Sequence, residues 1–147
     1  MQKTAYSRPL PVPDPESTPF WDGMRESKLM LQRCASSGEY LFPPVTFCPG
    51  SLERPEWVEA SGKGEIFSWI VVRHPVPRDL YADEVPYVVA IVALEEGCRM
   101  TGNIFDCAPE DVRAGMKVEI VYNRVTPEIT LPAFRPTGGW TMAAPVA

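Results

Sequence analysis

The 147 residues carry a net charge of −5 and are 45% hydrophobic, which fits one domain, or one domain with an appendage. This acidic balance argues against electrostatic binding of nucleic acid, which needs clustered Lys and Arg, and no apolar run approaches the ~20 residues of a membrane span. The first residues, MQKTAYSRPLPVPDPES, lack the apolar stretch of a secretory signal, so the four cysteines favour a reducing, cytoplasmic compartment.

Residues 1–15 form a proline-rich arm at the start of the chain. Pro9, Pro11, Pro13 and Pro15 alternate there. Alternating prolines favour an extended polyproline II chain and prevent a helix or a sheet. A disordered tail is the favoured interpretation. An arm that lies along a partner is the alternative, because a stiff chain loses less entropy when it docks.

Residues 16–33 predict a short amphipathic helix and a first strand. Thr18 can cap the helix, and Phe20 and Met24 share one of its faces, with Trp21 beside them. Such a helix usually packs on its own domain. Aromatic side chains near a chain end are also good interface anchors, so we expect Phe20, Trp21 and Met24 to contact a partner subunit.

Residues 34–60 contain a spacing that is typical of a zinc ribbon, in which two C-x-x-C loops hold the metal. In the segment RCASSGEYLFPPVTFCPGS, Cys34 and Cys48 each precede a serine by three positions, at Ser37 and Ser51. The second cysteine of each loop is therefore missing.

Residues 61–136 alternate as β-strands. Five such runs, with a short helical insertion APEDVRAGM between the third and the fourth, predict a small Greek-key barrel of the OB type. A β-sandwich would need about seven strands. Residues 137–147 are interpreted as a C-terminal tail. The runs are GEIFSWIVVRH, PYVVAIVALEEG, CRMTGNIFD, MKVEIVYNRVT and EITLPAFRP.

In this order of elements the chain resembles a family of acyl-CoA-associated proteins that join a rubredoxin-like zinc ribbon to an OB-fold, known as domain of unknown function 35. The resemblance covers roughly residues 16–136 and implies a mainly β fold with an N-terminal helix, a degenerate ribbon and a five-stranded barrel. It rests on PFWDGMRESKLMLQRC, YLFPPVTFCP, VEASGKGEIFSWIVV, VPYVVAIVALEEGCRMTGNI, PEDVRAGMKVEIVY and LPAFRP, in this order.

The family's proteins accompany thiolase-like enzymes. The resemblance therefore implies a non-catalytic accessory subunit that binds a thiolase, a condensing enzyme or a retro-aldolase and helps to hold or channel an acyl-CoA. The alternatives are a stand-alone OB module for nucleic acid and an independent acyl-CoA enzyme. The chain offers no assembled catalytic set, because His74 is expected at the surface and Cys98 and Cys107 as small buried side chains. We predict no catalytic residue.

Lys63, Arg73 and Arg78 are the candidates for binding the phosphates of a CoA thioester. Arg73 and Arg78 flank the loop after the first barrel strand, where OB-folds bind ligands. Ordinary surface bases are an equally good interpretation of all three residues.

The resemblance implies metal ligands at Cys34, Ser37, Cys48 and Ser51. Because a serine hydroxyl does not replace a thiolate for zinc, we expect no zinc and no other cofactor. Hydrogen bonds from Ser37 and Ser51 across the former site are expected to hold the ribbon instead. A Cys34–Cys48 disulfide is conceivable, since the sulfurs of the two loops face each other, but a reducing compartment argues against it. Packing is expected from Tyr40, Leu41, Phe42, Val45, Phe47 and Trp57.

Overall fold

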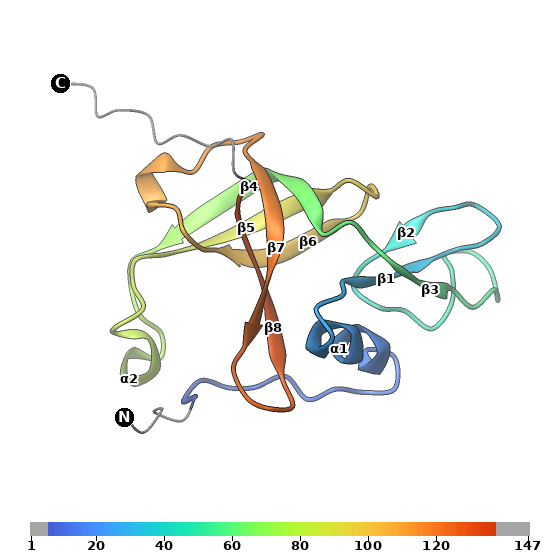
Figure 1. The fold of residues 1–147 in the computed structure, drawn as a ribbon, viewed down its shortest axis with the longest axis horizontal. Helices are drawn as coiled ribbons and strands as arrows, with labels where there is room; N and C mark the ends of the chain where they lie inside the picture. The colour runs from blue at the N-terminus through green and yellow to red at the C-terminus, as the bar shows by residue number, and fades with distance from the viewer. Residues whose placement is uncertain (1–5, 138–147) are drawn as a thin grey trace.

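The computed structural model of the chain describes residues 6–137, in which a small sheet and a closed β-barrel lie side by side with a helix between them (Figure 1). The small sheet has the strand order β2-β1-β3, and the barrel has the order β4-β5-β6-β8-β7. The predicted fold class, a helix and a ribbon followed by a five-stranded OB barrel, is confirmed. The predicted tail lies outside the described residues, apart from residue 137.

The barrel follows from strands whose side chains alternate between its interior and its surface. In β5 (Tyr87–Leu94), Val88, Ala90, Val92 and Leu94 are buried and the residues between them are more exposed, as period-2 alternation requires. The other barrel strands are β4 (Lys63–Val72), β6 (Arg99–Ile104), β7 (Lys117–Arg124) and β8 (Thr130–Pro136).

Two features close the barrel. The long strand β4 shifts register between Ile66 and Ser68, an irregularity that lets it bend and pair with both β5 and β7. At the other side, β6 and β8 pair in parallel. There the fully buried ring of Phe134 lies against Gly102, where an added Cβ would come within 2.9 Å of the ring.

Two short helical segments occur in the connections of the barrel. Helix α2 (Arg78–Tyr81) lies between β4 and β5, and the 3₁₀ turn η1 (Pro109–Asp111) is the predicted insertion between β6 and β7. No helix in residues 6–137 is long and apolar enough to span a membrane.

The ribbon region consists of β1 (Met30–Arg33), β2 (Tyr40–Leu41) and β3 (Glu56–Glu59), in antiparallel pairs. Its side chains join those of the barrel in one hydrophobic core, which includes Leu29 and Leu31. The two parts are therefore coupled by shared packing.

Helix α1 (Thr18–Arg25) lies between the ribbon and the barrel and contacts β1, β7 and β8 (Figure 1). Phe20 is 4% exposed and Met24 is fully buried, and the ring of Phe20 packs against Trp21 and Phe42. The structure therefore corrects the prediction that Phe20 and Met24 anchor a partner. Their apolar face is already covered by the chain's own sheet and barrel, and Trp21 is half-buried beside them.

The proline-rich arm also differs from the sequence interpretation. Residues 6–15 lie along their own barrel instead of forming a disordered tail (Figure 1). Arg8 forms an ion pair with Glu84 at 3.3 Å, and Asp14 and Ser17 exchange hydrogen bonds just before α1. Each contact attaches the arm to a structured part of the same chain.

Candidate functional site

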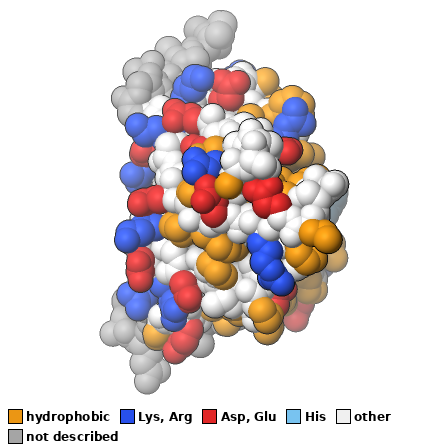
Figure 2. All heavy atoms as spheres, turned by 90° about the vertical axis from the view of Figure 1, so that its right-hand side faces the viewer, with side chains coloured by type: hydrophobic (Ala, Val, Ile, Leu, Met, Phe, Trp, Pro, Cys, Tyr) orange, Lys and Arg blue, Asp and Glu red, His pale blue; other side chains and the backbone are white. Residues whose placement is uncertain are grey.

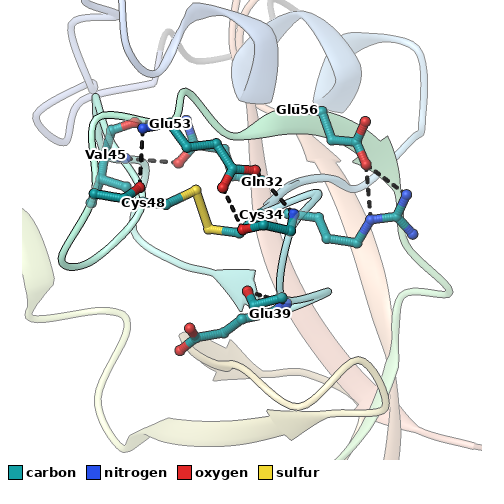
Figure 3. The surroundings of a disulfide bond; sticks show 11 residues. Gln32, Cys34, Glu39, Val45, Cys48, Glu53 and Glu56 are labelled. Carbon is teal, nitrogen blue, oxygen red and sulfur yellow. Dashed lines mark hydrogen bonds and ion pairs between the residues drawn. A yellow bond between two sulfur atoms is a disulfide. The ribbon is translucent and has the colours of Figure 1, made fainter.

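The two loops of the ribbon have the same local hydrogen-bond pattern. In the first knuckle, residues 34–39, the amide of Cys34 donates to the carbonyl of Glu39 at 2.9 Å. In the second knuckle, residues 48–53, the amide of Cys48 donates to the carbonyl of Glu53 at 2.8 Å. Each loop thus turns back on itself, and the two turns bring the sulfurs together (Figure 3).

The structure joins Cys34 and Cys48 by a disulfide across a Cα–Cα distance of 6.0 Å, and both side chains are buried. The expectation that compartment chemistry would prevent this bond was therefore wrong for this structure. The folding of the two knuckles holds the two sulfurs close together and shields them from solvent.

Ser37 and Ser51 do not bond across the knuckles as the sequence suggested. The hydroxyl of Ser37 accepts a hydrogen bond from the amide of Glu39, and that of Ser51 accepts one from the amide of Glu53. A serine readily bonds to the amide two residues later, so each hydroxyl stabilises its own turn. Of the predicted packing residues, Tyr40, Phe42 and Trp57 join the core, whereas Val45 and Phe47 are exposed.

Two side chains tie the knuckle loops together in addition to the sulfurs (Figure 3). The buried amide of Gln32 bonds both the carbonyl and the amide of Val45, at 2.9 and 2.8 Å. The carboxylate of Glu53 accepts hydrogen bonds from the hydroxyl and the amide of Ser36, and these bonds lower the pKa of Glu53. Polar contacts within the ribbon thus add to the hydrophobic core that the ribbon shares with the barrel.

A pocket of about 460 Å³ lies on the opposite part of the molecule, between the arm and the barrel. Tyr6 and Arg8 of the arm line one side, and Tyr81 and Glu84 of the β4–β5 connection line another. Residues of β5 and β6, among them Asn103, form the wall together with Asn123 of β7 and Leu131 and Pro132 of β8. In OB-folds, the face formed by the second and third strands and the first connecting loop is the usual place for a ligand.

The three predicted CoA-binding residues do not converge. Lys63 begins β4 and Arg73 follows its last residue, so the two lie at opposite ends of a ten-residue strand. Arg73 and Arg78 flank the same connection and are both exposed, but neither lines the pocket. The sequence identified the loop that carries the pocket but not the residues that line it.

Arg8 and Glu84 were missed because they lie far apart in the sequence. The signal available for Arg8 was a cation two residues after Tyr6 and directly before the first proline of the arm. Glu84 follows Asp83 in the connection between the first two strand runs, where the sequence alone indicates a solvated surface acid. Only the docking of the arm on the barrel brings the two side chains together.

The other candidate reactive groups are not arranged for catalysis. His74 is exposed at the end of β4. Burial raises the pKa of the Cys98 thiol, and burial followed by the charge of Asp111 raises that of Cys107. A raised pKa keeps a thiol protonated and therefore weakly nucleophilic.

Exposed apolar side chains occur on the ribbon and on the barrel. Figure 2 shows the ribbon end of the molecule, where hydrophobic side chains lie among charged ones. On the ribbon, Leu52 is 85% and Phe47 41% exposed. On the barrel, Phe67 and Ile70 of β4 are also exposed, at 51% and 62%.

Two family models match the chain in consecutive segments. Residues 21–57 match the rubredoxin-like zinc ribbon domain of ChsH2, and residues 57–123 match the C-terminal OB-fold domain of ChsH2. The boundary between the two matches falls in β3.

Among known proteins, the chain is 41% identical over 108 residues to a DUF35 domain-containing scaffold protein of Methanocaldococcus jannaschii, covering 71% of this chain and 75% of that protein. It is 38% identical over 137 residues to a probable enoyl-CoA hydratase alpha subunit of Thermomonospora curvata. That match covers 92% of this chain but 42% of the relative, so the chain spans less than half of the longer protein.

Among solved structures, the chain resembles a chain of the Ltp2-ChsH2(DUF35) aldolase with a TM-score of 0.76 and 37% identity. The match covers 86% of this chain and 98% of the other.

The match to a zinc ribbon domain corrects the expectation that the chain takes no zinc, because the matched domain is named for this metal and points to zinc binding. The donor chemistry in the structure fits a four-ligand site only in part. Cys34 and Cys48 bring two sulfurs to the site, but these are joined to each other and would bind zinc only as free thiolates. No cluster of three or more His, Cys, Asp or Glu suited to a metal occurs in the described part of the chain. Structural zinc takes four ligands, so the two cysteines would supply half of a complete set.

Proposed function

Because the chain belongs to the DUF35 family, in which a ChsH2-type zinc ribbon precedes an OB-fold, we propose that it is a non-catalytic accessory subunit of a thiolase-like enzyme. In this role it binds the enzyme in a hetero-oligomer and helps to hold an acyl-CoA substrate. The observation that carries the proposal is the likeness to the ChsH2(DUF35) chain of an aldolase complex, which extends over nearly the whole of that chain.

The chemistry of the described residues supports a role without catalysis. The two free thiols have raised pKa values, and the exposed His74 has no nucleophile beside it in the sequence. A catalytic nucleophile needs an adjacent base or a lowered pKa. The buried residues of the barrel are apolar side chains that fill its interior.

The relatives named as hydratase alpha subunits support a second candidate function. This chain corresponds to one part of such a subunit, so it could serve a hydratase whose remaining part is supplied by another polypeptide. The two candidates differ in the enzyme that is served, and both give this chain a supporting role. A cytoplasmic location is part of both proposals.

The partner surface is proposed to lie outside α1, since Phe20 and Met24 are buried. The exposed side chains of Leu52, Phe67 and Ile70 are available for such contacts. For the CoA phosphates, Arg73 and Arg78 remain the proposed contacts, because they lie on the same connection.

The test is to purify the tagged chain from its native host and to assay the complex and the isolated chain with acyl-CoA substrates. We expect a thiolase-fold enzyme to co-purify with the chain and to lose activity or solubility when it is produced without the chain. We expect no turnover of acyl-CoA by the isolated chain. A hydratase as the stable partner would favour the second candidate. Turnover by the isolated chain would reject both.

A further inference from the structure

The arm side and the barrel side of the pocket carry opposite charges. On its arm side, Arg8 supplies a cation. On its barrel side, Glu84 is the one charged side chain among the described residues that line it. In the sequence Glu84 lies between Tyr81, the last residue of α2, and Tyr87, the first residue of β5, whose ring centroids are 6.1 Å apart. Without the arm, the barrel side would present one carboxylate with aromatic rings, which suits a cation and repels a phosphate.

Arg8 contacts both the carboxylate and an aromatic ring of the barrel side. Its guanidinium lies 3.3 Å from the carboxylate of Glu84 and 5.9 Å from the ring centroid of Tyr81. The ring of Tyr6 lies on the guanidinium as well, at 4.9 Å. A planar guanidinium suits this combination of a carboxylate and aromatic faces better than an ammonium does.

The rest of the arm is attached less closely. Between residues 6–13 and the described barrel there is no backbone hydrogen bond. Leu10 and Val12 are 41% and 89% exposed. The Arg8–Glu84 pair is itself partly exposed, and pairs of this kind contribute little to stability. The arm is therefore a docked segment that another segment of the same chemistry can displace.

We propose that this pocket is a recognition site for an arginine presented on an extended, proline-rich segment. Aromatic grooves bind such segments because the polyproline II conformation is already formed before docking. In the structure Arg8 of the chain's own arm already fills the Glu84–Tyr81 corner of this pocket, and the pocket volume is the space left beside the arm. The partner that fits the site is a segment of another protein with an arginine flanked by proline and an aromatic residue. This inference does not depend on which enzyme the chain serves.

The test uses the full-length chain and a synthetic peptide of residues 6–17, YSRPLPVPDPES. In the Arg8→Ala chain the cation site is vacated, so the peptide should bind and shift the amide resonances of Tyr81, Glu84 and Asn103 in two-dimensional NMR spectra. In the unmodified chain the peptide should bind at least tenfold more weakly, because the tethered arm competes at an effective concentration on the order of millimolar.

Two substitutions test the contacts, and a third is the matched control. The same peptide carrying Arg8→Ala should bind more weakly, and Glu84→Gln in the Arg8→Ala chain should also weaken binding, whereas Glu128→Gln at another exposed acid should not. Equal binding to the unmodified and Arg8→Ala chains would overturn the proposal. So would the absence of shifts at millimolar peptide, or an unchanged affinity after Glu84→Gln, provided that the spectra show each variant to be folded.

Discussion

The carboxylate of Glu53 in the second knuckle accepts hydrogen bonds from both the amide and the hydroxyl of Ser36 in the first knuckle. The two loops are thus joined by a side chain as well as by sulfur. These bonds hold the pKa of Glu53 below its ordinary 4.5, with the hydroxyl of Ser36 as the largest cause. Ionised Glu53 therefore favours the folded state.

This pair predicts a pH dependence. Because folding lowers the pKa of Glu53, its contribution to stability is present above the unfolded pKa and is lost as the pH falls through the folded pKa. Glu53→Gln should lower the melting temperature at about pH 7, and the difference from the unmodified chain should shrink towards about pH 3. Glu128→Gln is the control. A difference that is the same at both pH values would contradict the prediction.

The link between Cys34 and Cys48 predicts that the ribbon depends on its sulfurs. Both side chains are buried between the knuckles. Cys48→Ala should destabilise the chain by about 2–5 kcal/mol, the usual loss when a native cross-link is removed. Hydrogen exchange should increase first in β1 and β3. Cys107→Ala, at a free cysteine, is the matched control. Equal effects of the two substitutions would show that the link contributes nothing.

The burial of Phe20 predicts a loss of stability in the isolated chain. Phe20→Ala would leave a cavity where α1 meets the ribbon and the barrel, at an expected cost of about 3–5 kcal/mol. Trp21→Ala should cost less, because Trp21 is half-buried. Urea denaturation of each variant measures the difference. A Phe20→Ala chain that is as stable as the unmodified one but fails to bind its enzyme would restore the interface interpretation.

The close approach of Gly102 to Phe134 predicts that the barrel cannot accept a larger residue there. A Cβ at Gly102 would lie 2.9 and 3.0 Å from two ring atoms of the fully buried Phe134. Gly102→Ala should therefore cost about 1–3 kcal/mol through overpacking. The extra cost should shrink in a Phe134→Leu background, which makes room. Additive effects in a double-mutant cycle would argue against a direct clash.

The positions of Lys63, Arg73 and Arg78 predict which of them contribute to the binding of an acyl-CoA. In the complex with the enzyme, Arg73→Ala together with Arg78→Ala should weaken acyl-CoA binding about tenfold, which is ~1.4 kcal/mol. The effect should diminish at high salt. Lys63→Ala, at the opposite end of β4, should have no effect. Calorimetric titration of the complex compares them, and an equal loss from Lys63→Ala would indicate a nonspecific effect of charge.

The architecture could be predicted in detail because it depends on local patterns. The run YVVAIVAL forms β5, and Glu95 to Gly97 form the turn that follows. The family prediction is confirmed as well, since it rested on six segments in a fixed order. The expectation of no zinc was wrong, because substitutions at two ligand positions were given more weight than the overall likeness to a ribbon domain.

The sequence by itself determined the five barrel strands, their order along the chain and the family, because alternation, turn residues and segment order are all recorded along the chain. Only the tertiary structure decided which side chains meet. Phe20 could face a partner or the core until α1 packed between the ribbon and the barrel. Arg8 and Glu84 became a pair only when the arm docked on the barrel. Such contacts depend on how distant segments fold onto one another, and the periodicity of a single segment contains no information about its distant neighbours.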